Sequence, residues 1–339
     1  MTSPLDVFSS MRKLLLFLAA AIAACSAQVP KPPWAGGASP AGRAPAAGSP
    51  NSGAAQNSDA TIKVDVKLVN VFVTVTDEHG APVGGLVKEN FQLLEDGTAQ
   101  TVSVFDKESA LPLSIVMDID TSLSTRKDLP LELTSARRFA HAILRPVDAL
   151  CLYEFSETVD EIVPFTADLK TIDRGIDRIR YGAATALYDA IYLGAQAVER
   201  RQGRKVMVVI TDGGDTVSRV DYKEAVRAAQ EAEAIVYSII IVPIEASAGR
   251  DLGGEHALIQ ISEDTGGKYF YATSLPELDE AFRKISDELR TQYLLAYYPS
   301  QRFSDSNFRK IEVKVTGASR SSAMVVRHRT GYYTQKSHF

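Results

Sequence analysis

Three short polar segments carry the side chains in this sequence that could bind a ligand. The segment Asp120–Ser124 (Asp-Thr-Ser-Leu-Ser) follows a continuous apolar run, and Thr211–Asp215 follows a second one. Between them, Gly182–Asp189 leads into an expected helix and contains Thr185. Hydroxyl and carboxylate oxygens suit Mg²⁺ and Mn²⁺, because these hard cations take six oxygen ligands and release water reluctantly. The segments therefore indicate divalent-cation chemistry if the fold brings them together.

Residues 108–291 alternate strand and helix patterns, which is typical of a parallel, doubly wound sheet. Continuous apolar runs predict buried strands at 113–117, 150–155, 205–210 and 235–242. Helical spacing predicts helices over 129–144, with Leu133 on the buried side, over 187–198 and over 274–290. Capping boxes are expected at Asp221–Glu224 and at Ser274–Glu277. In such a sheet, ligands bind beyond the carboxyl ends of the strands, where two of the polar segments begin.

Both flanks of this region have strand patterns. In residues 61–107, Val69 to Val75 alternate, and Phe91–Glu95 followed by Asp96-Gly97 predicts a hairpin with a two-residue turn. Residues 292–339 contain further short strand patterns, at 293–298, 311–315, 325–326 and 332–333. Each flank alone has too few strands to be stable. We therefore expect one β-sandwich built from both flanks, with residues 108–291 inserted into it.

The three polar segments, in this order, resemble a von Willebrand factor A domain with a metal ion-dependent adhesion site. The matching motifs are Asp-x-Ser-x-Ser from Asp120, Gly-x-x-Thr-Ala-Leu-Tyr-Asp-Ala from Gly182, and Ile-Thr-Asp-Gly from Ile210. The resemblance implies a Rossmann-like α/β fold and a site for Mg²⁺ or Mn²⁺. Its metal residues are Asp120, Ser122, Ser124, Thr185 and Asp212. The two serines would bind the metal directly, the threonine directly or through water, and the two aspartates mostly through water.

The resemblance also implies a partner. Because few protein carboxylates bind the metal directly, it stays electron-poor, and an Asp or Glu carboxylate of a partner protein would fill the open position. Leu123 stands where many members have glycine, which bears on access beside the metal. The flanking segments, such as Gly85–Phe91 and Tyr293–Pro299, resemble an exported A-domain-related family of acidobacteria. The sequence thus predicts a metal-dependent protein-binding module that is not an enzyme.

Two alternatives remain open at this stage. Asp118-Ile119-Asp120 also resembles the first motif of haloacid dehalogenase-type phosphatases, with Asp118 as nucleophile and Asp120 as acid and base. The spacing from Asp215 to Asp221 does not fit that family, and Thr185 would have no role in it. The other alternative is a structural envelope scaffold without metal-dependent binding.

The N-terminal residues 1–27 have the features of an export signal. Arg12 and Lys13 precede an apolar run over 14–24, which fits a signal-peptide core and is too short for a mature membrane helix. The run ends in a possible lipobox at Cys25, and cleavage after Ala27 is the alternative; translation starts at Met1 or Met11. Residues 28–60 are rich in Pro, Gly, Ala and Ser and predict a disordered linker. We expect a periplasmic, cell-surface or secreted protein that contacts a membrane only through a lipid anchor.

The composition excludes several other classes. A chain of 339 residues with 45% hydrophobic and 23% charged residues is typical of globular proteins. The formal net charge of -5 offers no general attraction to nucleic acid, so no nucleic-acid partner is expected. Apart from Cys25, the only cysteine is Cys151, and its apolar surroundings predict a core residue rather than a catalytic thiol.

Overall fold

The computed structural model describes residues 68–107, 111–242, 252–300, 308–316 and 324–334. The chain divides into two compact units, Met1–Ile62 and Lys63–Phe339, and all described residues belong to the second. The expected signal peptide with its lipobox (1–27) and the expected linker (28–60) lie outside the described residues. Those assignments remain predictions from the sequence.

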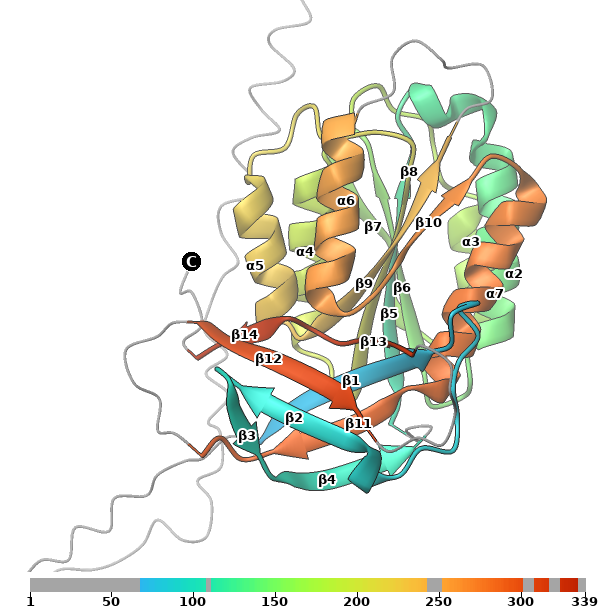
Figure 1. Cartoon of the computed structure of the whole chain (residues 1–339). Coiled ribbons are helices and arrows are strands. Elements are labelled where there is room, and N and C mark those ends of the chain that lie inside the picture. The colour runs from blue at the N-terminus through green and yellow to red at the C-terminus, as the bar shows by residue number, and fades with distance from the viewer. Residues whose placement is uncertain (1–67, 108–110, 243–251, 301–307, 317–323, 335–339) are drawn as a thin grey trace, which may run out of the picture. The chain divides into compact units, whose positions relative to one another are not determined.

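A six-stranded sheet forms the centre of the described structure (Figure 1). Its order is β10-β9-β8-β5-β6-β7, and every neighbouring pair is parallel except β6 and β7. The strands are β5 (Leu113–Asp120), β6 (Ala149–Phe155), β7 (Val159–Thr166), β8 (Arg204–Thr211), β9 (Ala234–Ile241) and β10 (Tyr269–Ala272). Every residue of β5 and β9 is buried, as expected for parallel strands with both faces covered.

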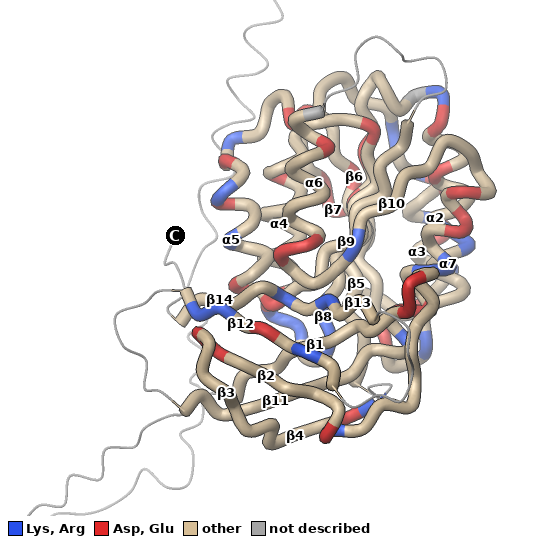
Figure 2. The backbone as a smooth tube through the Cα atoms, viewed as in Figure 1, with Lys and Arg blue, Asp and Glu red and all other residues tan. Residues whose placement is uncertain are grey.

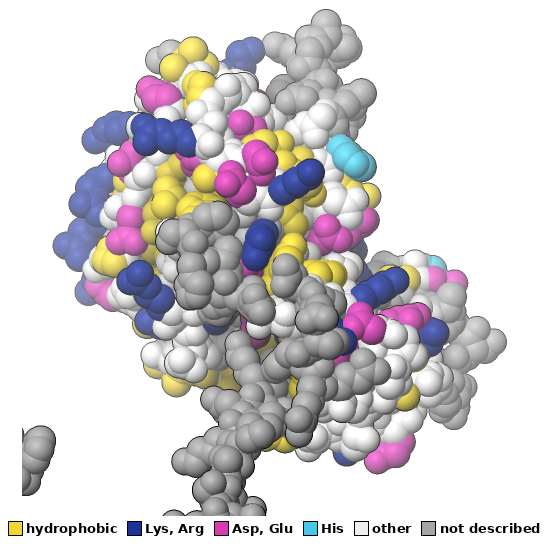
Figure 3. Space-filling view, turned by 90° about the vertical axis from the view of Figure 1, so that its left-hand side faces the viewer, with side chains coloured by type: hydrophobic (Ala, Val, Ile, Leu, Met, Phe, Trp, Pro, Cys, Tyr) yellow, Lys and Arg dark blue, Asp and Glu magenta, His cyan; other side chains and the backbone are white. Residues whose placement is uncertain are grey.

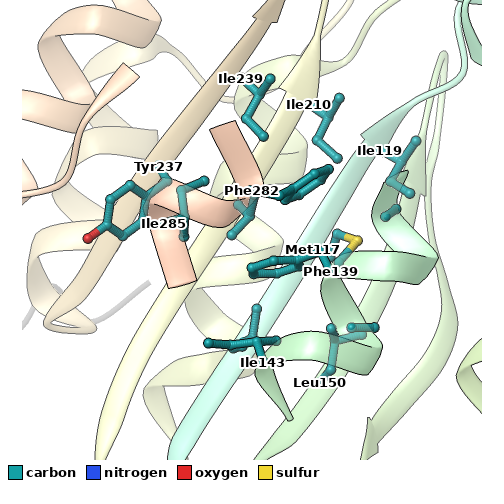
Figure 4. Packing of buried hydrophobic residues seen from close by; sticks show 14 of the residues in the cluster. Met117, Ile119, Phe139, Ile143, Leu150, Ile210, Tyr237, Ile239, Phe282 and Ile285 are labelled. Carbon is teal, nitrogen blue, oxygen red and sulfur yellow. The ribbon is translucent and has the colours of Figure 1, made fainter. Parts of the chain in front are cut away.

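Helices cover both faces of this sheet (Figure 1). The helices are α2 (Leu129–Ile143), α3 (Leu169–Ile176), α4 (Leu187–Glu199), α5 (Tyr222–Glu231), α6 (Leu252–Thr265) and α7 (Leu275–Thr291), with short 3₁₀ helices η1 (Lys88–Asn90) and η2 (Ser124–Lys127). The helices α2, α3 and α7 share one core with the sheet, and α4, α5 and α6 share the other. Phe139 of α2 stacks on Phe282 of α7 with ring centroids 4.7 Å apart (Figure 4). The predicted doubly wound, mostly parallel α/β fold is confirmed.

The two flanks of the chain build two further four-stranded sheets, β13-β1-β11-β4 and β14-β12-β2-β3. Their strands are β1 (Val69–Thr76), β2 (Phe91–Glu95), β3 (Thr98–Gln100), β4 (Val102–Lys107), β11 (Tyr293–Tyr297), β12 (Phe308–Val315), β13 (Val325–Arg327) and β14 (Gly331–Tyr333). Each sheet pairs early strands with late ones, for example Val71 of β1 opposite Leu295 of β11. Both sheets contribute to one apolar core, so the predicted sandwich from both flanks is confirmed.

Two local predictions have different outcomes. Asp96 (φ 47°) and Gly97 (φ 78°) both have positive φ and join β2 to β3, as expected for a two-residue hairpin turn. The capping box at Asp221 forms, whereas the one predicted at Ser274 is wrong: the Ser274 side chain makes no capping hydrogen bond. Glu277 instead accepts hydrogen bonds from the amide and the hydroxyl of Thr273, each 2.7 Å long. The carboxylate therefore pairs with the residue before the expected cap.

Acidic and basic residues are both distributed along the described chain (Figure 2). On the face shown in Figure 3, Lys and Arg side chains are interspersed with Asp and Glu. That face therefore has no large area of a single charge sign, in agreement with the small net charge. Within the described ranges, no helix is both long enough and apolar enough to cross a membrane.

Candidate metal centre

The order of the sheet places the first and third polar segments next to each other. From β5 the chain continues outward to β6 and β7, and from β8 it continues in the other direction to β9 and β10. The carboxyl ends of the neighbouring strands β5 and β8 are therefore a topological switch point, where ligands bind in open α/β sheets. Asp120 ends β5, and Asp212 follows the last residue of β8.

Hydrogen bonds connect four of the five predicted site residues. The Ser122 amide donates to Asp120 Oδ1 (2.9 Å), and the Thr211 hydroxyl donates to Asp120 Oδ2 (2.5 Å). Ser122 Oγ lies 3.0 Å from Ser124 Oγ, which in turn donates to Asp212 Oδ1 (2.8 Å). The backbone turn after β5 thus holds both serine hydroxyls between the two aspartates.

The spacing of these oxygens fits a small divalent cation. Octahedral Mg²⁺ with Mg–O distances of about 2.0–2.1 Å has adjacent ligand oxygens about 3 Å apart. The separation of 3.0 Å between the two serine hydroxyls matches two adjacent ligands, and the Asp212 carboxylate accepts a hydrogen bond from Ser124 (2.8 Å) beside them. No group of three or more His, Cys, Asp or Glu side chains within the described ranges could hold a metal ion. A cation at this place would therefore depend on the hydroxyls of Ser122 and Ser124.

The remaining predicted residue, Thr185, lies in the loop before α4. Its amide donates to the Thr216 hydroxyl (2.9 Å), and its carbonyl accepts from the Thr216 amide (2.8 Å). Three residues earlier, the Gly182 amide donates to the Thr121 carbonyl (2.8 Å). These bonds attach the Thr185 loop to the segments that follow β5 and β8. They position its backbone, and the role of its hydroxyl as a metal ligand remains a prediction.

The electrostatics of the site favour a bound cation. Burial, with a smaller contribution from the nearby Asp212 carboxylate, raises the pKa of Asp120 to about 6 against the hydrogen bonds from Thr211 and Ser122. Burial also raises the pKa of Asp212, and the Asp128 carboxylate adds to this effect. Both shifts mean that the ionised carboxylates are poorly compensated by the surrounding protein.

Comparison with known proteins identifies the fold around this site. Residues 115–214 match the family model described as von Willebrand factor type A domain. The chain contains a von Willebrand factor type A domain. A comparison with curated proteins finds no match.

Several solved structures are similar to this chain. A conserved hypothetical protein BatB from Bacteroides thetaiotaomicron is 21% identical, over 53% of this chain and 100% of that chain, with a TM-score of 0.43. A von Willebrand factor type A protein from Catenulispora acidiphila is 11% identical, over 77% of this chain and 73% of that chain, with a TM-score of 0.47. The vWF domain of the type V pili tip protein Mfa5 from Porphyromonas gingivalis is 13% identical, over 52% of this chain and 95% of that chain, with a TM-score of 0.41.

Asp118, which the phosphatase alternative requires as its nucleophile, is buried in the type A domain. Asp118 is 0% exposed, and a Cβ atom added to Gly194 of α4 would lie only 3.4 Å from Asp118 Oδ1. Burial raises the pKa of Asp118 well above its usual value. The residue that the phosphatase alternative would use as nucleophile is therefore shielded from solvent in this structure.

Two polar residues of the type A domain were missed by the sequence analysis. Thr211 bonds the Asp120 carboxylate, and the Ile-Thr-Asp-Gly motif that contains it was the available signal. Glu132 of α2 is 1% exposed, whereas Leu133, expected on the buried side, is only partly buried. The pattern of Leu129, Ala136 and Phe139 on the buried side of α2 includes position 132 at helical spacing. Because Glu132 is charged, it interrupted the apolar pattern, and its burial was not recognised from the sequence.

The metal binding that the sequence predicts for this centre should weaken at acid pH. A proton on Asp120 competes with the cation, and with a pKa of about 6 this carboxyl is mostly protonated at pH 5 and mostly ionised at pH 7. The affinity for Mg²⁺ should therefore be about tenfold lower at pH 5 than at pH 7. Calorimetric titrations at pH 5, 6, 7 and 8 measure this change. Equal affinities at pH 5 and pH 7 would contradict it, because only a carboxyl near its ordinary pKa is ionised at both.

Proposed function

We propose that this chain is an exported, divalent-metal-dependent protein-binding module. In this proposal Asp120, Ser122, Ser124, Thr185 and Asp212 hold Mg²⁺ or Mn²⁺, and the metal captures an Asp or Glu carboxylate of a partner protein. The observation that carries the proposal is the pair of hydroxyls of Ser122 and Ser124, 3.0 Å apart like adjacent ligands of one octahedron, with Asp212 hydrogen-bonded to Ser124 beside them.

The ligand set explains why such a site would bind an anion. The hydroxyls of Ser122 and Ser124 are neutral, so a bound cation keeps most of its charge and attracts a further anionic oxygen. Leu123, between them, is 56% exposed, which puts this turn at the surface of the domain. Binding of a carboxylate here makes and breaks no covalent bond. The proposed activity is therefore adhesion or interaction, and the protein is not an enzyme.

The proposed location follows from the N-terminal sequence. Residues 1–27 would direct the chain to the periplasm, the cell surface or the medium, and a lipid on Cys25 would provide the only membrane contact. The linker over 28–60 would hold the folded part away from the membrane. No nucleic-acid partner is proposed, because the chain is weakly acidic overall.

The test is a titration of the full chain with Mg²⁺ and Mn²⁺ by calorimetry and by melting temperature. We expect saturable binding that is about 100-fold weaker in Asp120→Ala and in Thr185→Ala, because each change removes a group that holds the metal or its water. Thr134→Ala is the matched control. This α2 threonine is exposed and lies outside the site, and the hydrogen bond described for its hydroxyl is donated to the Pro130 carbonyl.

The outcomes separate binding from a scaffold role. Circular dichroism checks that each variant keeps its fold. Saturable binding by the unmodified chain and by Thr134→Ala, lost in the two site variants, supports the proposal and justifies a search for partners that present a carboxylate. The proposal fails if the unmodified chain shows no saturable binding at millimolar metal.

A further inference from the structure

Glu132 is a buried carboxylate without a described hydrogen-bond partner. Its side chain lies in the first turn of α2 and is 1% exposed. Within the described part of the chain, no group donates a hydrogen bond to either of its two carboxylate oxygens. Leaving such a group unsatisfied destabilises the fold, and more so when the group is charged. A residue of this kind needs a physical explanation.

The position of Glu132 points to the metal centre. Figure 4 shows Phe139 of α2 beside Met117 of β5. Glu132 precedes Phe139 by seven residues, which is about 10 Å along the helix. Asp120 follows Met117 by three residues, which is about 10 Å along the strand. Because α2 begins just after the Ser124 turn, its N-terminus lies at the carboxyl end of β5. Along the strand direction, Glu132 therefore lies at the same height as Asp120, at the carboxyl end of β5.

The charges around Glu132 agree with this position. Burial raises the pKa of its carboxyl group well above the usual value, and the carboxylates of Asp120, Asp212 and Asp128 raise it further. Asp120 is the last residue of β5, Asp212 follows β8, and Asp128 directly precedes α2. The buried side chain thus experiences the two aspartates of the metal centre as its charged neighbours. A cation between those aspartates would offset the repulsion.

We propose that Glu132 is a positioning residue of the metal centre, whose carboxylate accepts hydrogen bonds from water bound to the cation. This inference rests on the proposed function. Direct coordination is not proposed, since no group of three or more acidic, His or Cys side chains in the described structure could hold a metal. Metal-bound water is a strong donor and would satisfy both oxygens. The centre would then carry three carboxylates around its two serine hydroxyls.

The test compares Glu132→Gln with Asp118→Asn in the full chain, using calorimetric titration with Mg²⁺ and with Mn²⁺. Both changes replace a buried carboxyl group without a described partner by an amide of similar size. Glu132→Gln is expected to weaken metal affinity about 10–100-fold, whereas Asp118→Asn should stay within about twofold of the unmodified chain. Glu132→Asp, which keeps the negative charge, is expected to retain more affinity than Glu132→Gln. Melting temperatures without metal show that the variants are folded.

Each outcome has a distinct meaning. Unchanged affinity in Glu132→Gln overturns this inference and leaves the proposed function intact. Equal losses in Glu132→Gln and Asp118→Asn also overturn it, because they assign the effect to general packing of the domain. If Glu132→Gln fails to fold, Glu132→Asp decides: withdrawing the carboxylate by one methylene should weaken the affinity, and unchanged affinity overturns the inference. Absence of saturable binding to the unmodified chain overturns the proposed function and this inference together.

Discussion

Replacing Phe282 with alanine is expected to lower the free energy of unfolding by about 3–5 kcal/mol. The Phe282 ring is buried and stacks on Phe139 with an interplanar angle of 25°, so the change leaves a cavity between α7 and α2 (Figure 4). Both rings belong to the core that packs these helices on the central sheet. Urea unfolding followed by circular dichroism measures the effect.

The control for Phe282→Ala is Tyr298→Ala. Tyr298 is 54% exposed, and its removal should change the free energy of unfolding by about 0.5 kcal/mol or less. Because Phe139 and Phe282 share one contact, the double variant should lose less stability than the two single variants added together. A loss below about 1 kcal/mol for Phe282→Ala would show that α7 does not depend on this packing.

Replacing Glu288 with alanine is expected to cost about 3 kcal/mol of unfolding free energy. Glu288 lies near the end of α7, and its Oε1 atom is 2.5 Å from Nη2 of Arg327 in β13. The same guanidinium donates to the Gly267 carbonyl (2.7 Å). Both side chains of the pair are largely shielded from water, so removing the carboxylate leaves a charge without its partner. The pair connects the type A domain to the sandwich at the point where α7 leads into β11.

An exposed ion pair in the same helix provides the matched control for Glu288→Ala. Glu280 pairs with Arg283 at 2.6 Å, and both side chains are exposed to solvent. Glu280→Ala should therefore cost about 1 kcal/mol or less. Urea unfolding of the two variants, at low and at high salt, compares the pairs directly. Similar losses in both variants would mean that burial does not strengthen the connection between α7 and β13.

Two elements that the sequence analysis did not predict are β7, which is mostly exposed or partly buried, and α3, which is short. In β7 most residues are only partly buried or exposed, and Pro164 interrupts it, which is tolerated because β7 is the edge strand of the sheet. The helix α3 has eight residues, of which Ile172, Gly175 and Ile176 are buried. Among the described strands, β7 pairs only with the adjacent strand β6, and the apolar spacing of α3 extends over about two turns, so neither element has a long apolar pattern.

The candidate centre was predictable to the extent that its residues are neighbours along the chain. Asp120, Ser122 and Ser124 fall in one turn after a buried strand, and Asp212 falls directly after another, so strand prediction and motif order were sufficient to place them. Glu132 was not predictable in this way. Its burial depends on the side of α2 that faces the sheet, and that side is chosen by the packing of the whole helix.

Local patterns in the chain were enough to predict the α/β fold and the sandwich built from both flanks, because strands and turns are encoded over a few consecutive residues. The five candidate ligands followed from the resemblance of three short motifs to a known family. Long-range packing decided the rest. The pairing of β5 with β8 set the distance between the Ser124 hydroxyl and Asp212, and the docking of α2 brought Glu132 to the level of Asp120. Such distances depend on contacts between residues far apart in the chain, which no local pattern records.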